Sequence, residues 1–325
     1  MKYFTGNISE TDEPVTPARG LCQEGAPGVG RVMTKKISHL FEYLLLRLLQ
    51  AVLSIIPRNS ALAIGSVLGI CLFLSGAYRK IIRKNMEFVN LWPPEQQKTI
   101  TRKLYRMMGR YAADFLRPST PLPPHEIKNY ELVPPLFEKG KGVIALLAHF
   151  GNWELLADIF GSRLKCLSVV AKPMRNRLVD KWLSRKRSAA SVETIVSDQA
   201  LRRIYESVRN NGMVAVLIDQ NAGSQGTSAP FLGKETSTVR TVAGLVHRTG
   251  CAVLPIYALL REDGTYEVSM SVAPPPSMSN ASDDCCISAL QRQHNDIISA
   301  WIREHPEHWF GWFHKRFRES IKYKE

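Results

Sequence analysis

The sequence lacks the signatures of several common catalytic and binding classes. It has six cysteines but no Cys-x-x-Cys pair and no His/Cys cluster at zinc-ligand spacing, so we expect neither a disulfide scaffold nor a metal site. No Gly-x-Ser-x-Gly elbow indicates a serine nucleophile, and the glycines around Lys141 do not extend into a phosphate-binding loop. No motif indicates a bound cofactor, and we expect none.

Acidic residues are few relative to basic ones. The 325-residue chain has 43 Lys and Arg against 29 Asp and Glu, a formal net charge of +14. Such an excess indicates an anionic partner: nucleic acid, an acidic membrane surface or a phosphorylated substrate. The basic residues are spread along the chain without an RRM, zinc-finger or helix-turn-helix signature, so we do not expect nucleic-acid binding. A basic membrane- or nucleic-acid-binding protein without catalysis is the non-enzyme alternative.

The first third of the chain divides into a polar leader and an apolar segment. Residues 1–32 are rich in Gly, Pro, Thr and acids, and we expect a disordered leader or a start assigned too far upstream. Residues 33–84 contain an amphipathic stretch, Leu40–Ile56, and a charge-free stretch of 17 residues, Ala61–Ala77, followed by a basic cluster. We expect a membrane-anchoring helical segment here, with the basic cluster on the cytoplasmic side near anionic lipid. A pair of buried core helices is the alternative.

Residues 85–325 have the pattern of one catalytic domain. Gln96–Leu116 has helical spacing, and a proline-rich break follows it. Beyond the break, short apolar runs suited to buried strands alternate with helix-like stretches. We predict an α/β fold with a mainly parallel central sheet flanked by helices, preceded by the N-terminal membrane-associated helical segment. The expected strands are Gly142–Ala148, Leu167–Ala171, Met213–Ile218 and Cys251–Tyr257, and the expected helices are Trp153–Phe160, Leu178–Arg187, Ala200–Asn210 and Val239–Arg248.

Polar groups follow three of the expected strands. His149 comes after the first, Lys172 after the second, and Asp219 with Gln220 after the third. In open α/β sheets the ligand crevice lies outside the carboxyl ends of the strands. We therefore expect these side chains to converge on one site.

His149 and Glu154 form the most informative local pattern. On a regular helix five residues turn about 500°, so the two side chains would point roughly 140° apart. They can meet only if His149 precedes the helix and Glu154 lies in its first turns, which the Gly151-Asn152 turn permits. A carboxylate beside the imidazole would fix its tautomer and stabilise the imidazolium. The pair would be a general-base dyad that takes its nucleophile from the substrate. A structurally satisfied His and Glu at a helix start is the alternative.

Several motifs, in order, resemble the lipid A lauroyl/myristoyl acyltransferase family of the lysophospholipid-acyltransferase-like superfamily. The central motif is a strand followed by His149-Phe-Gly-Asn-Trp-Glu154, which resembles the first block of the family. The resemblance covers about residues 35–318, and the ordered set is more specific than any one motif. The other matching segments are residues 78–85, residues 172–176, Asp219-Gln220, residues 230–233, residues 302–309 and residues 312–317.

The resemblance implies acyl transfer from an acyl-carrier-protein thioester to a hydroxyl of a lipid A precursor at the inner membrane, with the catalytic domain on the cytoplasmic side. His149 would take the hydroxyl proton, Glu154 would orient His149, and no covalent enzyme intermediate would form. The family places an important Arg on the helix after the second strand, where Arg187 fits best and Arg185 is the alternative. Acyl carrier protein, the phosphorylated lipid A precursor and anionic membrane lipid are the expected partners. The other expected substrate-binding residues are Asp219, Gln220, Asn152, Arg175 and Lys172.

Some alternatives stay open at this point. The catalytic residues do not encode the acceptor, so a lysophospholipid or another glycolipid is the alternative substrate. Phe231-Leu232-Gly233 replaces the family's more usual double Phe, a change that could alter acceptor or chain-length choice. A second His-x4-Glu spacing, His314 and Glu319, lies in the basic, aromatic C-terminal segment, and we interpret it as coincidence.

Overall fold

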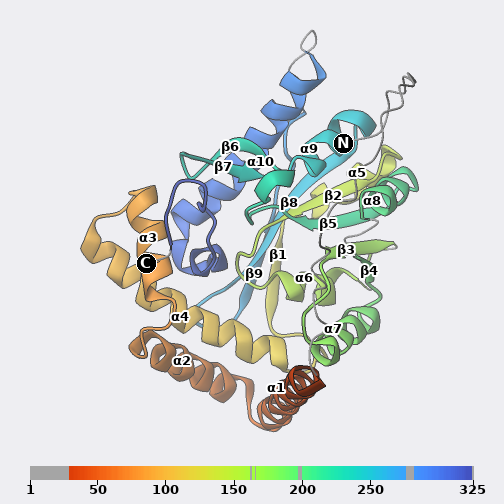
Figure 1. Ribbon diagram of the computed structural model, residues 1–325. Helices are drawn as coiled ribbons and strands as arrows, with labels where there is room; N and C mark the ends of the chain where they lie inside the picture. Colours follow the sequence, from red (N-terminus) through yellow and green to blue (C-terminus); the bar gives the residue numbers. More distant parts are fainter. Residues whose placement is uncertain (1–28, 162, 165, 197–199, 276–281, 324–325) are drawn as a thin grey trace, which may run out of the picture.

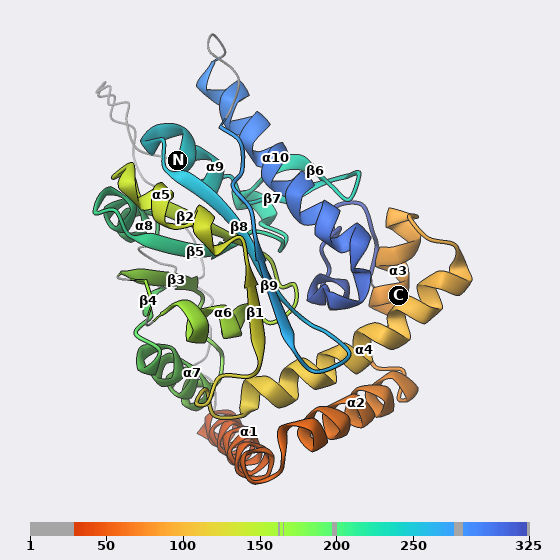
Figure 2. The ribbon, with the colours of Figure 1, turned by 180° about the vertical axis from the view of Figure 1, so that it is seen from behind.

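The computed structural model describes residues 29–323 apart from gaps at 162, 165, 197–199 and 276–281 (Figure 1). Helices cover both faces of a central sheet, and the first two helices lie together at one end of the molecule (Figures 1 and 2). The predicted α/β fold with a mainly parallel sheet flanked by helices is therefore confirmed. The predicted leader, residues 1–32, falls almost wholly outside the described residues.

The central sheet has seven strands in the order β1-β9-β8-β2-β5-β3-β4. Strands β8, β2, β5, β3 and β4 run parallel, whereas β9 pairs antiparallel with β8, and β1 lies parallel to β9. A separate antiparallel hairpin consists of β6 (Thr227–Phe231) and β7 (Lys234–Thr238). The strands of the central sheet are β1 (His125–Lys128), β2 (Val143–Leu147), β3 (Leu167–Ala171), β4 (Glu193–Val196), β5 (Met213–Leu217), β8 (Ala252–Leu260) and β9 (Tyr266–Met270).

Two apolar cores lie on the two sides of the sheet, because successive residues of a buried strand point to opposite faces. In β2, Ile144 and Leu146 belong to the core that includes side chains of α8, α9 and α10, and Ala145 and Leu147 belong to the core with α5 and α6. Every residue of β2 is buried, as the continuous apolar run predicted. These helices and α7 are α5 (Pro134–Glu138), α6 (Trp153–Phe160), α7 (Arg177–Ala189), α8 (Ala200–Arg209), α9 (Thr241–Thr249) and α10 (Asp283–Glu304).

The sequence analysis missed elements that lack a uniform apolar run. Strand β9 buries alternate side chains, and its other residues stay partly exposed. Helix α10 carries polar residues at buried positions, among them Gln291, His294 and Asn295, so its apolar periodicity is weak. Strand β9 extends the sheet between β8 and β1, and α10 packs in the helical layer with α9.

Helix α2 (Arg58–Leu74) packs on α4 (Pro94–Leu116) at very short range. Gly65 and Gly109 face each other, and a Cβ on Gly109 would lie 1.8 Å from the carbonyl oxygen of Gly65. A Cβ on Gly69 would lie 2.1 Å from the carbonyl oxygen of Tyr105. Any larger residue at these glycines would push the two helices apart. Between them, α3 (Arg79–Val89) runs across the expected domain boundary at residue 84.

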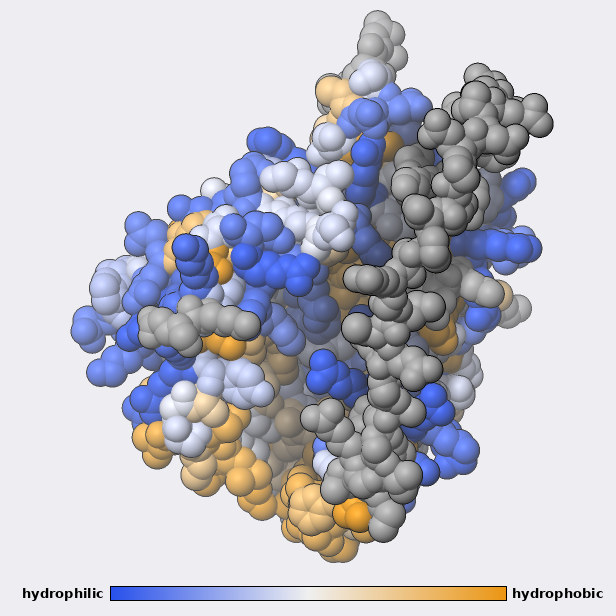
Figure 3. Space-filling view, in the orientation of Figure 1, coloured by the Kyte–Doolittle hydropathy of each residue, from blue (hydrophilic) through white to orange (hydrophobic). Residues whose placement is uncertain are grey.

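Helices α1 (Val29–Ile55) and α2 present an apolar surface (Figure 3). Within the described residues, Lys36–Ile55 is the one helix long and apolar enough to cross a membrane, and 6% of its most apolar window is buried. Helix α1 is therefore not a core helix. The charge-free stretch Ala61–Ala77 falls largely in α2, which has 17 residues and buries one face on α4. Helices α2 and α3 meet the same criterion only as a pair bent by 83°.

Candidate active site

His149 and Asp219 meet because their strands are neighbours in register. Strand β2 pairs with β5, and Leu147 lies opposite Leu217. Two residues further along each chain, His149 and Asp219 face each other at the carboxyl edge of the sheet. His149 Nδ1 lies 2.8 Å from Asp219 Oδ1. The structure thus brings together two of the polar groups expected at this edge.

Asp219 is fully buried and binds the histidine at two points. Besides the bond to the imidazole, Asp219 Oδ2 accepts from the backbone N–H of His149 at 3.0 Å and from the indole N–H of Trp309 at 2.8 Å. Burial alone would raise the pKa of Asp219, but the imidazole and these donors lower it below its usual value. A carboxylate held ionised in this way accepts the Nδ1 proton, which leaves the lone pair of His149 on Nε2.

The same pair raises the pKa of His149. Burial opposes the charged imidazolium, but the charge and hydrogen bond of Asp219 outweigh it, with a smaller contribution from the charge of Glu154. The Nε2 edge of the ring faces Gln220, whose side-chain nitrogen lies 3.3 Å away. The ring of Trp153 packs against the imidazole at 5.0 Å between centroids. The His149 side chain keeps 22% of its surface exposed.

The C-terminal segment, residues 305–317, holds both loops of the site. Phe150 pairs with Trp309 in an isolated antiparallel bridge, and the backbone N–H of Phe310 donates to the carbonyl of His149 at 2.8 Å. Arg316 is buried and donates to a carbonyl of the loop after β5 at 3.0 Å. The positions of His149 and Asp219 therefore depend on residues 305–317 as well as on the sheet.

The turn between His149 and α6 requires its glycine. Gly151 has φ 63°, and a Cβ there would lie 2.1 Å from the carbonyl oxygen of Ala258 on β8. Asn152, expected to bind substrate, caps α6 by accepting from the backbone N–H of Leu155 at 3.1 Å. Its amide also donates to the buried hydroxyl of Tyr266 at 3.0 Å. The structure thus gives Asn152 a positioning role at the helix start.

Glu154 lies in the first turn of α6, but the structure corrects the contact expected of it. Its carboxylate is held by Arg187 of α7, whose Nε lies 3.1 Å from Oε2 and whose Nη2 lies 2.5 Å from Oε1. The place beside the imidazole nitrogen is taken by Asp219. Strand register brings Asp219 directly opposite His149, whereas the pitch of α6 turns Glu154 toward α7. Glu154 acts on His149 through its charge.

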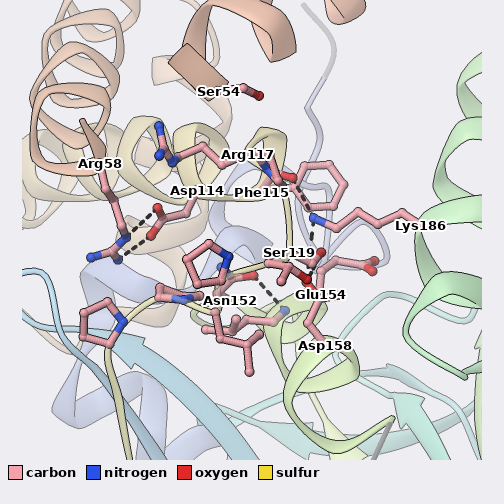
Figure 4. Close-up of a pocket in the computed structure, with 17 residues that line it drawn as sticks. Ser54, Arg58, Asp114, Phe115, Arg117, Ser119, Asn152, Glu154, Asp158 and Lys186 are labelled. Atoms are coloured by element: carbon pink, nitrogen blue, oxygen red, sulfur yellow. Dashed lines mark hydrogen bonds and ion pairs between the residues drawn. The ribbon is translucent and has the colours of Figure 1, made fainter. Parts of the chain in front are cut away.

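A cavity of about 280 Å³ lies beside Glu154 (Figure 4). Cations and carboxylates line it together, and most are paired. Arg58 binds Asp114, and Lys186 lies 3.8 Å from Asp158 while donating to a backbone carbonyl. The cavity therefore has little uncompensated charge. The charged residues of its lining are Arg58, Asp114, Arg117, Glu154, Asp158 and Lys186.

The remaining expected residues lie further from His149. Strand β5 separates β3 from β2, so Lys172 at the end of β3 is two strand spacings, roughly 10 Å, from the His149 loop. Lys172 and Arg175 are exposed. Arg185 lines a second cavity, between α1 and α7. Of the two arginines considered on α7, Arg187 is the one that reaches Glu154.

The sequence analysis did not assign Trp309 or His314 to the site. The ring of His314 lies 6.4 Å from that of His149, and burial, together with the nearby His149, lowers the pKa of His314. The spacing to Glu319 is a coincidence, since the Glu319 carboxylate binds the side chain of Asn221 at 2.7 Å. One sequence signal could have assigned both residues to the site. Trp309 and His314 lie in residues 302–309 and 312–317, two of the segments that resemble the family's ordered motifs.

Known proteins similar to this chain transfer acyl groups. Residues 33–319 match the family described as bacterial lipid A biosynthesis acyltransferase. The phosphatidylinositol mannoside acyltransferase of Mycolicibacterium smegmatis is 21% identical over 176 residues, 53% of this chain and 56% of that protein. That of Mycobacterium tuberculosis is 23% identical over 175 residues, 52% of this chain and 53% of that protein. The chain thus spans about half the length of the curated relatives it matches.

Proposed function

Because the chain belongs to the bacterial lipid A biosynthesis acyltransferase family and is an acyltransferase, we propose that it moves a fatty acyl chain from an acyl-carrier-protein thioester to a hydroxyl of a lipid A precursor. One observation supports this most strongly. A histidine at the carboxyl edge of the sheet has Nδ1 bound to a buried carboxylate, and its partly exposed ring turns Nε2 toward the side chain of Gln220. That arrangement is a general base without a nucleophile of its own, which suits direct transfer to a substrate hydroxyl.

In the proposed reaction, His149 Nε2 accepts the proton of the acceptor hydroxyl as its oxygen attacks the thioester carbonyl. The new C–O bond forms, the C–S bond breaks, and the proton passes from the imidazolium to the leaving thiolate. Asp219 holds the imidazole in the required tautomer and stabilises the imidazolium that forms. No acyl-enzyme intermediate is needed.

Arg187 stays our candidate for stabilising the charge that develops on the thioester oxygen. Glu154 binds two of its nitrogens, and this bidentate pair fixes the direction of the guanidinium. In this proposal Glu154 is a positioning residue for Arg187, and its charge also favours the imidazolium of His149.

The proposed partners and location follow from charge and surface. Acyl carrier protein is acidic and lipid A precursors carry phosphates, so a chain of net charge +14 attracts both. The apolar surface of α1 and α2 would hold the enzyme at the inner membrane, on its cytoplasmic side, against anionic lipid.

A second acceptor class has its own support. Both relatives named above are phosphatidylinositol mannoside acyltransferases, so a different phosphorylated glycolipid is the alternative acceptor. The same base and the same thioester chemistry would serve it.

The test is acyl transfer in membranes, read by mass spectrometry. Acyl-carrier-protein donors of several chain lengths are offered with Kdo2-lipid IVA or, in parallel, with a phosphatidylinositol mannoside. We expect one acceptor to gain an acyl chain, and His149→Ala to reduce that transfer by about 10² or more. His247→Ala, on α9 and paired with Asp283 at 3.0 Å, is the matched control and should keep full activity. Undiminished transfer by His149→Ala would remove this histidine from the mechanism.

A further inference from the structure

Helix α1 turns a polar face toward α7. Tyr43, Arg47 and Gln50 follow one another at helical spacing and line a cavity together with residues of α7. Further along the same contact, Asn176 at the start of α7 donates to Glu42 at 2.9 Å. The opposite face of α1 is the exposed apolar one, with Ile37, Leu40, Phe41, Leu44, Leu48, Val52 and Ile55. The cavity therefore lies at the border between the apolar face of α1 and the body of the protein.

This cavity, which we call the α1–α7 cavity, has a volume of about 280 Å³. Its lining contains four cations, and no carboxylate among the described residues reaches it. The lining residues are Tyr43, Arg47, Gln50, Arg117, Pro118, Ser119, Trp182, Arg185 and Lys186.

The cavity beside Glu154 gives the contrast that identifies the ligand. The two cavities share Arg117, Pro118, Ser119 and Lys186, so they adjoin. In the first, carboxylates compensate the cations, and Figure 4 shows Arg58 directed at Asp114. In the α1–α7 cavity Lys186 has Asp158 at 3.8 Å, whereas the three arginines pair with no carboxylate among the described residues. Three arginines without a carboxylate partner around one opening attract an anion.

Two of these cations are available for a ligand. Arg117 is used by the protein, since its guanidinium donates to the carbonyls of Leu53 and Ile56 at the end of α1. Arg47 and Arg185 have no hydrogen bond or ion pair with any described residue. The buried side-chain oxygen of Gln50 has no partner within the described residues either.

We propose that the α1–α7 cavity binds a phosphate group of the acceptor lipid, held by Arg47 and Arg185. This rests on the proposed function. Guanidinium groups bind phosphate oxygens with directed, charge-assisted hydrogen bonds. The border of the apolar face of α1 is the level at which a membrane lipid carries its phosphates. The adjoining cavity continues from this site to Glu154 in the first turn of α6, next to the His149 loop.

The test compares acceptors with and without phosphate in neutral-detergent micelles. The acceptor is Kdo2-lipid IVA, either with its phosphates or after their enzymatic removal. Each form is offered to the wild type, Arg47→Gln and Arg185→Gln. Lys181→Gln is the control, because Lys181 is an exposed cation on the same helix that lines neither cavity. We expect each arginine variant to raise the KM for the phosphorylated acceptor about tenfold. The kcat should stay within twofold, and the dephosphorylated acceptor should bind the wild type and both variants equally.

Two further results would overturn the assignment. Equal KM values for the arginine variants and Lys181→Gln would show that the cavity holds no acceptor phosphate. If the variants lost binding to vesicles with anionic phospholipid but kept the wild-type preference for phosphorylated acceptor, the cavity would be a bilayer-lipid site instead.

A direct binding measurement separates this proposal from the proposed reaction. Equilibrium binding of radiolabelled acceptor in the same micelles needs no transfer. If no acyl chain moves but the arginines still distinguish the phosphorylated from the dephosphorylated lipid, the reaction fails and the site stands. If transfer proceeds and the arginines make no distinction, the reaction stands and the site fails.

Discussion

Two carboxylates lie near the same histidine and are held in different ways. Asp219, after β5, is fully buried and accepts from the imidazole, from a backbone N–H and from an indole N–H. Glu154, in the first turn of α6, binds a guanidinium with both oxygens. The same functional group can thus set the tautomer of a base in one place and the direction of a cation in the other. The role of each carboxylate is decided by where its backbone lies in the fold. Its distance from His149 along the sequence does not decide it.

The largest expected effect comes from Asp219→Asn. The amide keeps the size of the carboxylate but cannot hold the Nδ1–H tautomer or balance the imidazolium, so we expect kcat to fall by about 10³. Steady-state kinetics in detergent measures this, and circular dichroism checks that the variant folds. A loss below tenfold would mean that Asp219 merely supports the loop.

A smaller loss is expected from Glu154→Gln, about 10-fold to 10²-fold in kcat, because Arg187 would keep one acceptor and lose its direction. The side chains of Glu154 and Arg187 are each 13% exposed. The single variants Glu154→Gln and Arg187→Gln should therefore each lose about 1–3 kcal/mol of unfolding free energy.

The double variant Glu154→Gln/Arg187→Gln is the control for this pair. Denaturant unfolding should show less destabilisation than the sum of the two single variants. An additive result would mean that the Glu154–Arg187 interaction itself contributes nothing to the free energy of unfolding. A Glu154→Gln loss as large as that of Asp219→Asn would erase the difference between the two carboxylates.

The smallest expected effect is a displacement of the pH profile. The base must be neutral, so kcat/KM should rise as pH passes the His149 pKa, which Asp219 and, to a lesser degree, Glu154 hold above its usual value. We expect Glu154→Gln to move this rise slightly toward lower pH, and Asp219→Asn to move it further. NMR titration of the imidazole measures both, and equal displacements would contradict the ranking.

The same raised pKa has a consequence for stability. A pKa of His149 raised by folding stabilises the protein fully below about pH 6.5, the usual value for histidine. That contribution is lost as pH rises through the folded pKa. The lowered pKa of Asp219 acts in the opposite range, since its contribution is lost as pH falls through the folded value.

The sequence predicted the sheet where apolar runs were continuous. The run at residues 142–148 gave β2 to within one residue at each end, because a strand buried on both faces needs apolar residues throughout. Strand β9 escaped prediction because it alternates, and α10 because buried Gln291, His294 and Asn295 interrupt its apolar stripe.

The site was predictable as far as the strand ends and no further. His149 and Asp219 could be placed at one edge, but the order β2-β5-β3 decides which residue faces His149, and that order is set by packing across the whole sheet. Local spacing favoured Glu154 as the partner, and spacing cannot show that Arg187 arrives from another helix. Trp309 was out of reach for the same reason, since it lies 90 residues beyond Asp219 in the chain.

Because Trp309 and Arg316 hydrogen-bond to the loop of Asp219, the site around His149 can be completed only late in synthesis. Chains emerge from the ribosome amino end first, so α1 and α2 are available long before the segment that clamps the two loops. A nascent chain that ends before residue 309 therefore carries His149 and Asp219 but lacks the indole of Trp309 and the guanidinium of Arg316. The hydrogen bonds that hold the two loops can form only after residues 305–317 have been made.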